Sequence, residues 1–146
     1  MSSAAEEVFL DDVLVKHAGR LQRQTALSIR TDLHPTYVVG DPAALNEAVA
    51  GLVDHALSNA VSVIDLAVCR HGAEAIITVG DDGPCAAAEA LAERQRGLDR
   101  VARIVSGHGG ALTISDRAPC GTSVTARLPS TRQRHIRPLN DATSPG

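Results

Sequence analysis

Aromatic residues are almost absent from this chain of 146 residues, which contains one Phe, one Tyr and no Trp. Single-stranded nucleic acid binds largely through bases stacked on aromatic side chains. The chain also has no run of Lys or Arg, and its net charge at pH 7 is -3. Because clustered positive charge is what binds a phosphate backbone, nucleic acid is not an expected partner.

Long apolar runs are absent too, and no stretch approaches the length needed to span a bilayer. The first residues, Met1 to Glu7, are acidic where a secretory signal would be basic. The three cysteines, Cys69, Cys85 and Cys120, are far apart and form no C-x-x-C pair that would suggest zinc or redox chemistry. These features fit a reduced, cytoplasmic setting and no membrane contact by this segment.

Of the 146 residues, 44% are hydrophobic and 21% are charged. A chain of this length and composition can bury one core but is too short for two ordinary domains. Hydrophobic periodicity stops at Pro129, and the remainder contains Pro, Asn, Ser and Gly without a pattern. We therefore expect one domain over residues 1–129 and a disordered tail over residues 130–146.

Apolar spacing predicts three helices and six strands. The clearest helix begins at Asp41 and Pro42, a side-chain cap followed by a proline in the first turn, and its apolar stripe continues through Ala60. Residues 86–96 are rich in Ala, Glu and Arg and predict either a short helix or a mobile connection. The expected helices are 8–21, 41–60 and 98–105, and the expected strands are 26–33, 37–39, 63–69, 75–79, 112–115 and 124–128.

The order of these elements, α-β-β-α-β-β-α-β-β, implies an α/β fold of the α+β two-layer sandwich type. Three helices would cover one face of a mixed sheet, and the other face would be partly exposed. Order alone does not name a function, because one fold hosts many activities.

Four short stretches carry a resemblance to a known family. The helix from Asp41 to Ala60 is similar to the segment of bacterial sensor histidine kinases that carries the N box. In that family two Asn residues, four apart on this helix, face the triphosphate, and one holds the magnesium ion. Gly51 and His55 stand at those two positions here.

Two glycine-containing stretches extend the resemblance. Val79 to Cys85 resembles the first glycine box, V-x-D-x-G-x-G, with Cys85 in place of the last glycine. A carboxylate oxygen can accept a hydrogen bond from the adenine amine, and glycine lets the backbone pass close to the base. Gln95 to Leu98 resembles the second box, G-x-G-L, with Gln95 in place of the first glycine. Such a box meets phosphates at a helix amino terminus.

The fourth stretch looks like the closing helix, H-G-G turn and end strand of the same family, in Ile104 to Ile114 and Gly121 to Pro129. For Gly109 and Gly110, simple helix punctuation is the better interpretation. Four motifs in order, across nearly the whole expected domain, resemble the ATP-binding (HATPase, GHKL superfamily) domain of sensor histidine kinases and imply its Bergerat-type ATP-binding fold.

The resemblance implies a set of site residues. Asp81 and Gly83 would hold adenine, and Gly97 with Leu98 would meet phosphate. His55 is either a satisfied polar residue on a partly buried helix or a substitute ligand, and Asn59, one turn beyond, could restore an oxygen ligand for a metal. Imidazole is a poor ligand for magnesium, which prefers oxygen, so the substitutions argue against ordinary binding of magnesium and ATP.

Two further departures concern the lid and the phosphoacceptor. Thirteen residues separate Gly83 from Gly97, whereas most such kinases have a longer lid with an aromatic residue. None of the six histidines is followed by an acid, as a phosphoacceptor histidine usually is. The resemblance therefore implies a dimerisation and phosphoacceptor hairpin elsewhere, in the same parent protein or in trans, with a response regulator as an indirect partner.

The leading hypothesis is an ATP-binding domain for two-component signalling, with impaired nucleotide or magnesium binding and a regulatory role. One alternative is an active kinase module that phosphorylates a histidine in trans through His55 or Asn59 and a metal. A second alternative is an anti-sigma-like serine kinase and binding module. No catalytic residue is identified from the sequence.

Overall fold

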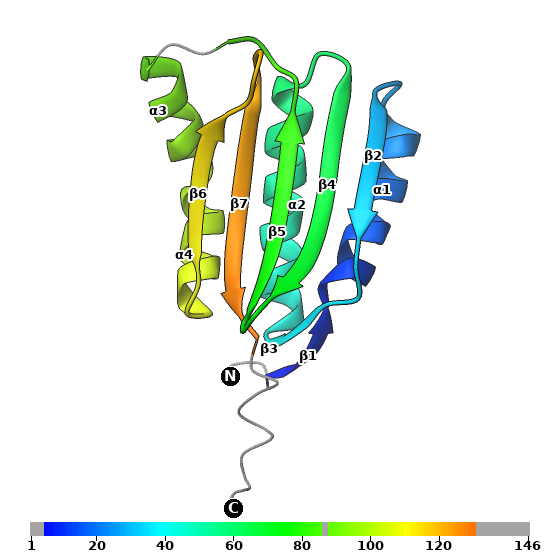
Figure 1. Ribbon diagram of the computed structural model, residues 1–146, viewed down its shortest axis with the longest axis vertical. Helices are drawn as coiled ribbons and strands as arrows, with labels where there is room; N and C mark the ends of the chain where they lie inside the picture. The colour runs from blue at the N-terminus through cyan, green and yellow to red at the C-terminus, as the bar shows by residue number, and fades with distance from the viewer. Residues whose placement is uncertain (1–4, 86–87, 131–146) are drawn as a thin grey trace, which may run out of the picture.

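The computed structural model describes residues 5–85 and 88–130 (Figure 1). The expected tail falls outside these residues except for Ser130, whose backbone nitrogen donates to Ala73 O at 2.7 Å. Among the described residues, no helix combines the length and the apolar character that crossing a membrane requires.

One layer of the fold is a five-stranded sheet with the strand order β2-β4-β5-β7-β6. Strand β2 runs parallel to β4, and the other neighbours are antiparallel, so the sheet is mixed as expected. The strands are β2 (Ser28–Leu33), β4 (Val63–His71), β5 (Glu74–Asp81), β6 (Ala111–Asp116) and β7 (Thr122–Pro129).

Three helices form the second layer, against one face of the sheet (Figure 1). They are α1 (Leu10–Gln24), α2 (Pro42–Asn59) and α4 (Asp99–Gly107). A fourth helix, α3 (Ala88–Gly97), lies beyond the end of β6, outside this layer. The ambiguous stretch before α4 is therefore largely helical, and the expected two-layer sandwich is confirmed.

The cap of α2 is the one expected from the sequence. The Asp41 carboxylate accepts hydrogen bonds from the backbone nitrogens of Ala43 at 3.0 Å and Ala44 at 3.4 Å, and Pro42 stands in the first turn. These bonds satisfy donors that a helix start leaves free. The carboxyl end of α2 lies next to the end of β5, since the Gly83 backbone passes close to the Asn59 carbonyl and Asp82 binds the turn after α2. The candidate site lies at this junction.

The core sits between the two layers and is built from aliphatic side chains. Alternate residues along each strand face the helices. The inward hydrophobic residues of the three central strands are Ile64, Leu66 and Val68 on β4, Ala75, Ile77 and Val79 on β5, and Val124, Ala126 and Leu128 on β7. The same alternation places Asp81 and Thr122 on the helix side, at the end of the core.

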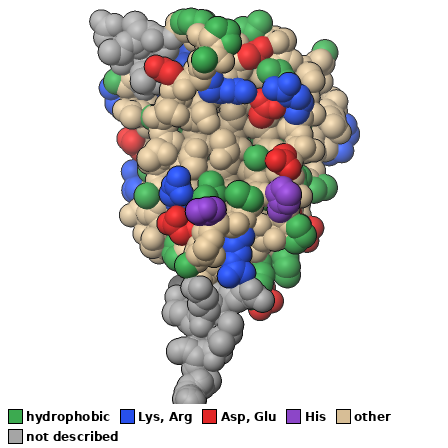
Figure 2. Space-filling view, viewed as in Figure 1, with side chains coloured by type: hydrophobic (Ala, Val, Ile, Leu, Met, Phe, Trp, Pro, Cys, Tyr) green, Lys and Arg blue, Asp and Glu red, His purple; other side chains and the backbone are tan. Residues whose placement is uncertain are grey.

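The opposite face of the sheet is open to solvent. Figure 2 shows this face, where charged and hydrophobic side chains are scattered between areas of backbone and small polar groups. Asp65 on this face pairs with Arg30 at 2.6 Å and with Arg117 at 2.9 Å. Both arginines hold the pKa of Asp65 below its ordinary value, the Arg30 hydrogen bond most strongly.

Two expectations about the amino-terminal part are wrong. Val8 and Phe9, the expected start of the first helix, belong to strand β1 (Glu6–Phe9), and α1 begins at Leu10. Strand β3 (Tyr37–Gly40) does not join the main sheet but pairs with β1 in a separate antiparallel ribbon. Val8 is buried by this pairing with a segment far along the chain, which local apolar spacing cannot reveal.

Candidate functional site

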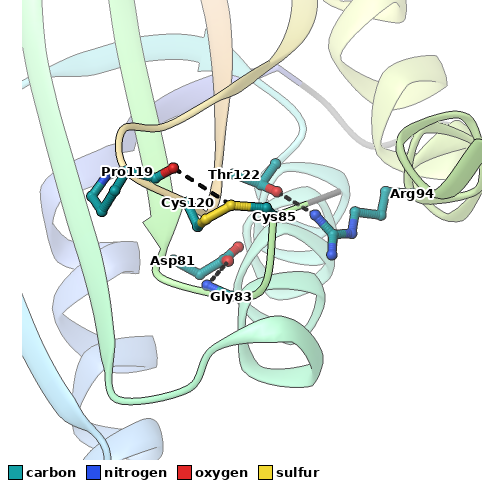
Figure 3. Close-up of a disulfide and its surroundings, with 7 residues drawn as sticks. All are labelled: Asp81, Gly83, Cys85, Arg94, Pro119, Cys120 and Thr122. Atoms are coloured by element: carbon teal, nitrogen blue, oxygen red, sulfur yellow. Dashed lines mark hydrogen bonds between the residues drawn. A yellow bond between two sulfur atoms is a disulfide. The ribbon is translucent and has the colours of Figure 1, made fainter. Parts of the chain in front are cut away.

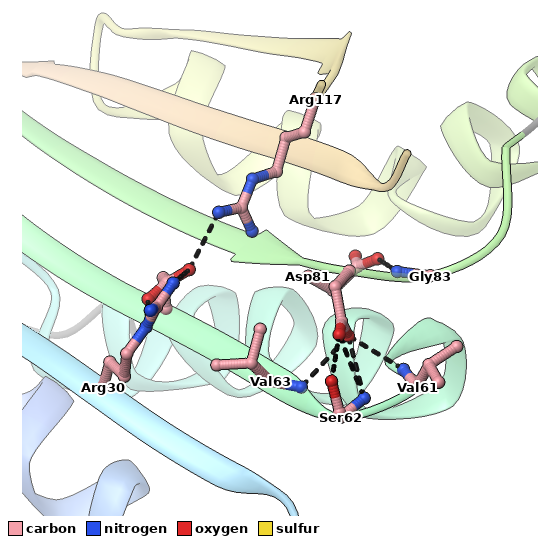
Figure 4. Close-up of polar contacts among 9 residues, drawn as sticks. Arg30, Val61, Ser62, Val63, Asp81, Gly83 and Arg117 are labelled. Atoms are coloured by element: carbon pink, nitrogen blue, oxygen red, sulfur yellow. Dashed lines mark hydrogen bonds and ion pairs between the residues drawn. The ribbon is translucent and has the colours of Figure 1, made fainter. Parts of the chain in front are cut away.

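Asp81 ends strand β5 on the face of the sheet that packs against the helices. Its side chain is 1% exposed. One carboxylate oxygen, Oδ1, accepts the Gly83 backbone N–H at 2.8 Å (Figure 4). The other oxygen has no hydrogen-bond partner among the described residues and is available for a ligand. A buried acceptor of this kind suits an amine donor such as the one on adenine.

Gly83 holds the turn after Asp81 close to helix α2. A Cβ atom at this position would stand 2.5 Å from the backbone oxygen of Asn59. A side chain is therefore excluded, and the turn can only pass this close to α2 as glycine. The structure thus brings Asp81, Gly83 and the end of α2 together, and their role in holding adenine stays a prediction.

His55 lies on α2 one turn before Asn59, near both Asp81 and Arg94. Burial lowers the pKa of His55 from its ordinary 6.5, the Asp81 charge raises it, and the Arg94 charge lowers it further. Both ring nitrogens are buried without a hydrogen-bond partner among the described residues. An unpaired buried polar group costs roughly 1–3 kcal/mol, so these nitrogens call for an explanation.

Asn59 is directed mainly to its own helix. Its side-chain nitrogen donates to the carbonyl of His55 at 2.8 Å. In the described part of the chain, no three His, Cys, Asp or Glu side chains come together as metal ligands do. The metal-binding roles of His55 and Asn59 stay predictions.

Gly51 faces helix α4 at close range. A Cβ atom at Gly51 would stand 2.5 Å from Cγ2 of Val101, which is 4% exposed. The position that resembles an Asn of the N box therefore has no side chain, and Val101 fills the adjoining space. Helix α4 consequently packs more closely on α2 than any larger residue at position 51 would allow.

The two expected phosphate-binding residues differ in exposure. Gly97 is at the surface and Leu98 is in the core. A Cβ atom at Gly97 would meet nothing within 4 Å. The Leu98 side chain is 2% exposed and belongs to the core, so only its backbone is available to a ligand. A cavity of about 350 Å³ between α4 and β6 includes Leu98 in its lining, but neither Asp81 nor His55 lines it.

Arg94 on α3 is a candidate site residue that the sequence did not reveal. Its Nη1 donates to Thr122 Oγ1 at 2.7 Å, which fixes α3 to the start of β7 (Figure 3). It is also the positive charge that lowers the pKa of His55. Guanidinium groups bind phosphate well, but the irregular composition of residues 86–96 gave no sign of this placement.

Asp82 has a structural role beside the site. Its carboxylate accepts the backbone N–H groups of Val61, Ser62 and Val63 at 2.9–3.0 Å (Figure 4). It also accepts the Ser62 hydroxyl, and these bonds, led by the hydroxyl, hold the pKa of Asp82 far below its ordinary value. Of the two adjacent carboxylates, Asp82 is occupied by the α2–β4 turn, and Asp81 has one oxygen without a partner among residues 5–85 and 88–130.

The structure joins Cys85 and Cys120 in a disulfide, with their Cα atoms 4.6 Å apart (Figure 3). The sequence did not predict this bond, and the reduced, cytoplasmic setting stays a prediction. The remaining cysteine, Cys69, is free and exposed. The two residues are separated by 35 positions. Their approach depends on the pairing of β5 with β7, which cysteine spacing does not show.

This sheet order, the helix layer on one face and the Asp81–Gly83 turn at the end of α2 define a class. The chain has the fold of the catalytic ATP-binding domains of sensor histidine kinases. The sequence matches no protein-family model and no curated protein significantly.

Solved structures show the particular resemblance. The mycobacterial sensor histidine kinase MprB matches at a TM-score of 0.76 and 24% identity, over 86% of this chain and 97% of that one. The ATP binding domain of PrrB from Mycobacterium tuberculosis matches at 0.72 and 24%, over 88% and 98%. Full-length ShkA in complex with AMPPNP matches at 0.74 and 16%, over 88% of this chain and 32% of that one.

Proposed function

We propose that this chain is a nucleotide-binding domain for two-component signalling that has kept the adenine end of its site and altered the metal and phosphate end. The observation that carries the proposal is the buried Asp81 carboxylate, with one oxygen on Gly83 and the other free. Support also comes from the fold, since similar structures include an ATP binding domain and a complex with AMPPNP.

At the adenine end, the Asp81 oxygen that is not bonded to Gly83 accepts the exocyclic amine of the base. His55 lies between this end and the phosphate end, near both Asp81 and Arg94. A neutral imidazole has one donor and one acceptor nitrogen, and both lack partners among the described residues. Its lowered pKa keeps the ring neutral at pH 7. A nucleotide offers both the acceptor and the donor groups that the ring needs.

At the phosphate end, the residues present do not fit magnesium. The ion prefers oxygen ligands in octahedral geometry, and the two N-box positions offer a bare backbone at Gly51 and an imidazole at His55. Val101 fills the space beside Gly51. The protein therefore binds ATP and ADP without needing the ion, and Arg94 supplies the positive charge that meets the phosphates.

Phosphoryl transfer depends mainly on positioning the phosphate and neutralising its charge. Altering that end harms catalysis more than adenine binding, so we assign the domain a regulatory role. It would act in the cytoplasm on a dimerisation and phosphoacceptor hairpin, in the same parent protein or in trans. A response regulator would be an indirect partner.

Isothermal titration of ADP into the wild-type protein and the Asp81→Asn variant tests the proposal. Asn keeps an oxygen for the Gly83 N–H but replaces the other carboxylate oxygen with a donor, which cannot accept the adenine amine. We expect binding by the wild type and a loss of about tenfold or more in the variant, equivalent to one hydrogen bond of about 1.5–3 kcal/mol. Unchanged affinity would place the nucleotide elsewhere.

A further inference from the structure

The disulfide lies directly beside the candidate nucleotide site. Cys85 follows the Asp81–Gly83 turn by two residues, and Cys120 lies in the β6–β7 turn (Figure 3). Cys85 is exposed and Cys120 is half-buried. Cys85 Sγ is also 3.5 Å from Pro119 O, a contact that a thiol form would keep as a weak hydrogen bond. Exposure of Cys85 makes the bond accessible to small thiols and disulfides.

The β6–β7 turn packs tightly on the backbone of Asp81. Asp81 pairs with Thr122 in the sheet. Gly121 has a positive φ of 123°, and a Cβ atom there would collide with the carbonyl oxygen of Asp81. A crosslink at Cys120 therefore acts on a segment that already touches the adenine end of the site.

The same hairpin also holds helix α3. Arg94 on α3 donates to Thr122 at 2.7 Å. The two attachment points, Cys120 and Thr122, flank Gly121. With the disulfide formed, Cys85 and Arg94 are both attached to this hairpin, at Cys120 and at Thr122.

We propose that Cys85 and Cys120 are a reversible thiol-modification site that regulates nucleotide binding at Asp81. The proposal rests on the function proposed above. The disulfide form retains Arg94 on Thr122 and restrains the loop from Asp82 to Cys85, so it binds nucleotide weakly. The dithiol form releases the loop, and Arg94 can then reach the phosphates.

The chemistry is thiol–disulfide exchange with a low-molecular-weight disulfide of the glutathione class. The exposed Cys85 thiolate attacks one sulfur of that disulfide, and the first small thiolate leaves. The Cys120 thiolate then attacks Cys85 Sγ in the mixed disulfide, and the second small thiolate leaves. The two protons lost by the cysteines end on the released thiols, so two protein thiols are oxidised while one small disulfide is reduced. The reverse exchange restores the dithiol.

The test is calorimetric titration of ADP into the full chain in oxidised and in reduced glutathione, with alkylation and intact mass confirming each thiol state. We expect reduction to tighten ADP binding roughly tenfold, within the usual range of coupling between two sites. By the reciprocity of linkage, ADP should shift formation of the disulfide toward more oxidising buffer. The Cys85→Ser and Cys120→Ser variants should bind like the reduced protein in either buffer.

Cys69→Ser is the matched control, because Cys69 is exposed and free on β4 and its loss should leave the redox response intact. Equal ADP affinity in the two thiol states, or failure of Cys85 and Cys120 to crosslink, would overturn this inference and leave the proposed function standing. Absence of ADP binding in both states would overturn both.

Discussion

Val101 on α4 lies against the bare backbone of Gly51, and this contact lets two helices of the core approach closely. At the residue scale it has two effects. It removes a side chain that could point at a triphosphate, and it fills the adjoining space with a buried methyl group. Restoring a side chain at position 51 alone would therefore strain the core before it rebuilt a metal site.

We predict that Gly51→Ala lowers the free energy of unfolding by roughly 1–2 kcal/mol, because an inserted Cβ overpacks the helix interface. Gly107→Ala is the control, since a Cβ at that helical position would meet nothing within 4 Å. The control should be neutral or slightly stabilising. Urea unfolding of both variants measures the difference, and equal stabilisation by the two would contradict the close contact.

We also predict that the stability of the protein depends on pH through His55. Burial holds its folded-state pKa below the ordinary 6.5, so its contribution to stability is complete above pH 6.5. Below that pH the unfolded state binds a proton more readily than the folded state does, so the free energy of unfolding falls. The slope for one histidine is at most about 1.4 kcal/mol per pH unit.

Urea unfolding between pH 7.5 and pH 5.5 should show this loss, and His55→Asn should reduce its slope. A residual slope is expected because burial also lowers the pKa of His17, against the opposing effect of its hydrogen bond to Asn46. The same slope in wild type and His55→Asn would show that the ring is not buried uncharged.

At the scale of elements, local pattern predicted most of the fold. The cap at Asp41, the stripe of α2 and the β4–β5 hairpin follow from residues adjacent in sequence. Strand β1 and the separate β1–β3 ribbon could not be predicted this way, because their partners are distant in the chain. The same reason hid the Cys85–Cys120 pair, which forms only when β5 and β7 align.

The candidate site likewise contains residues that local motifs predicted and residues that they did not. Asp81 and Gly83 were predicted because a motif of neighbouring residues defines them, and the structure places them together. Arg94 and Asp82 were not, since each acts on a residue 19 to 28 positions away. Leu98 was assigned to the ligand by its motif, but its side chain is in the core.

Asp82 connects the end of β5 with the α2–β4 turn, so we expect its loss to destabilise the fold. Asp82→Ala should lower the melting temperature clearly, since three backbone donors and a hydroxyl lose their acceptor. Asp81→Asn should leave it nearly unchanged, because the Gly83 N–H keeps an oxygen partner. Thermal unfolding by circular dichroism compares them, and a larger loss in Asp81→Asn would reverse the roles assigned to the two carboxylates.

At the scale of the whole molecule, two layers bring one end of the sheet and one end of α2 together, and the candidate site occupies that junction. The proposed adenine end is built from the sheet and α2, which pack against each other across the core. The phosphate end depends on α3 and α4, where the sequence departs from the histidine kinase pattern. A domain of this fold can therefore keep nucleotide binding while its phosphoryl transfer is impaired.

The most direct test is calorimetric titration of ATP into the reduced protein, once with magnesium chloride and once with a chelator. We predict equal affinity in the two buffers, because in the proposed site Asp81 and Gly83 hold the base and no residue of α2 supplies an oxygen ligand at positions 51 and 55. ATP binding tightened about tenfold or more by magnesium, equivalent to about 1.4 kcal/mol, would contradict it.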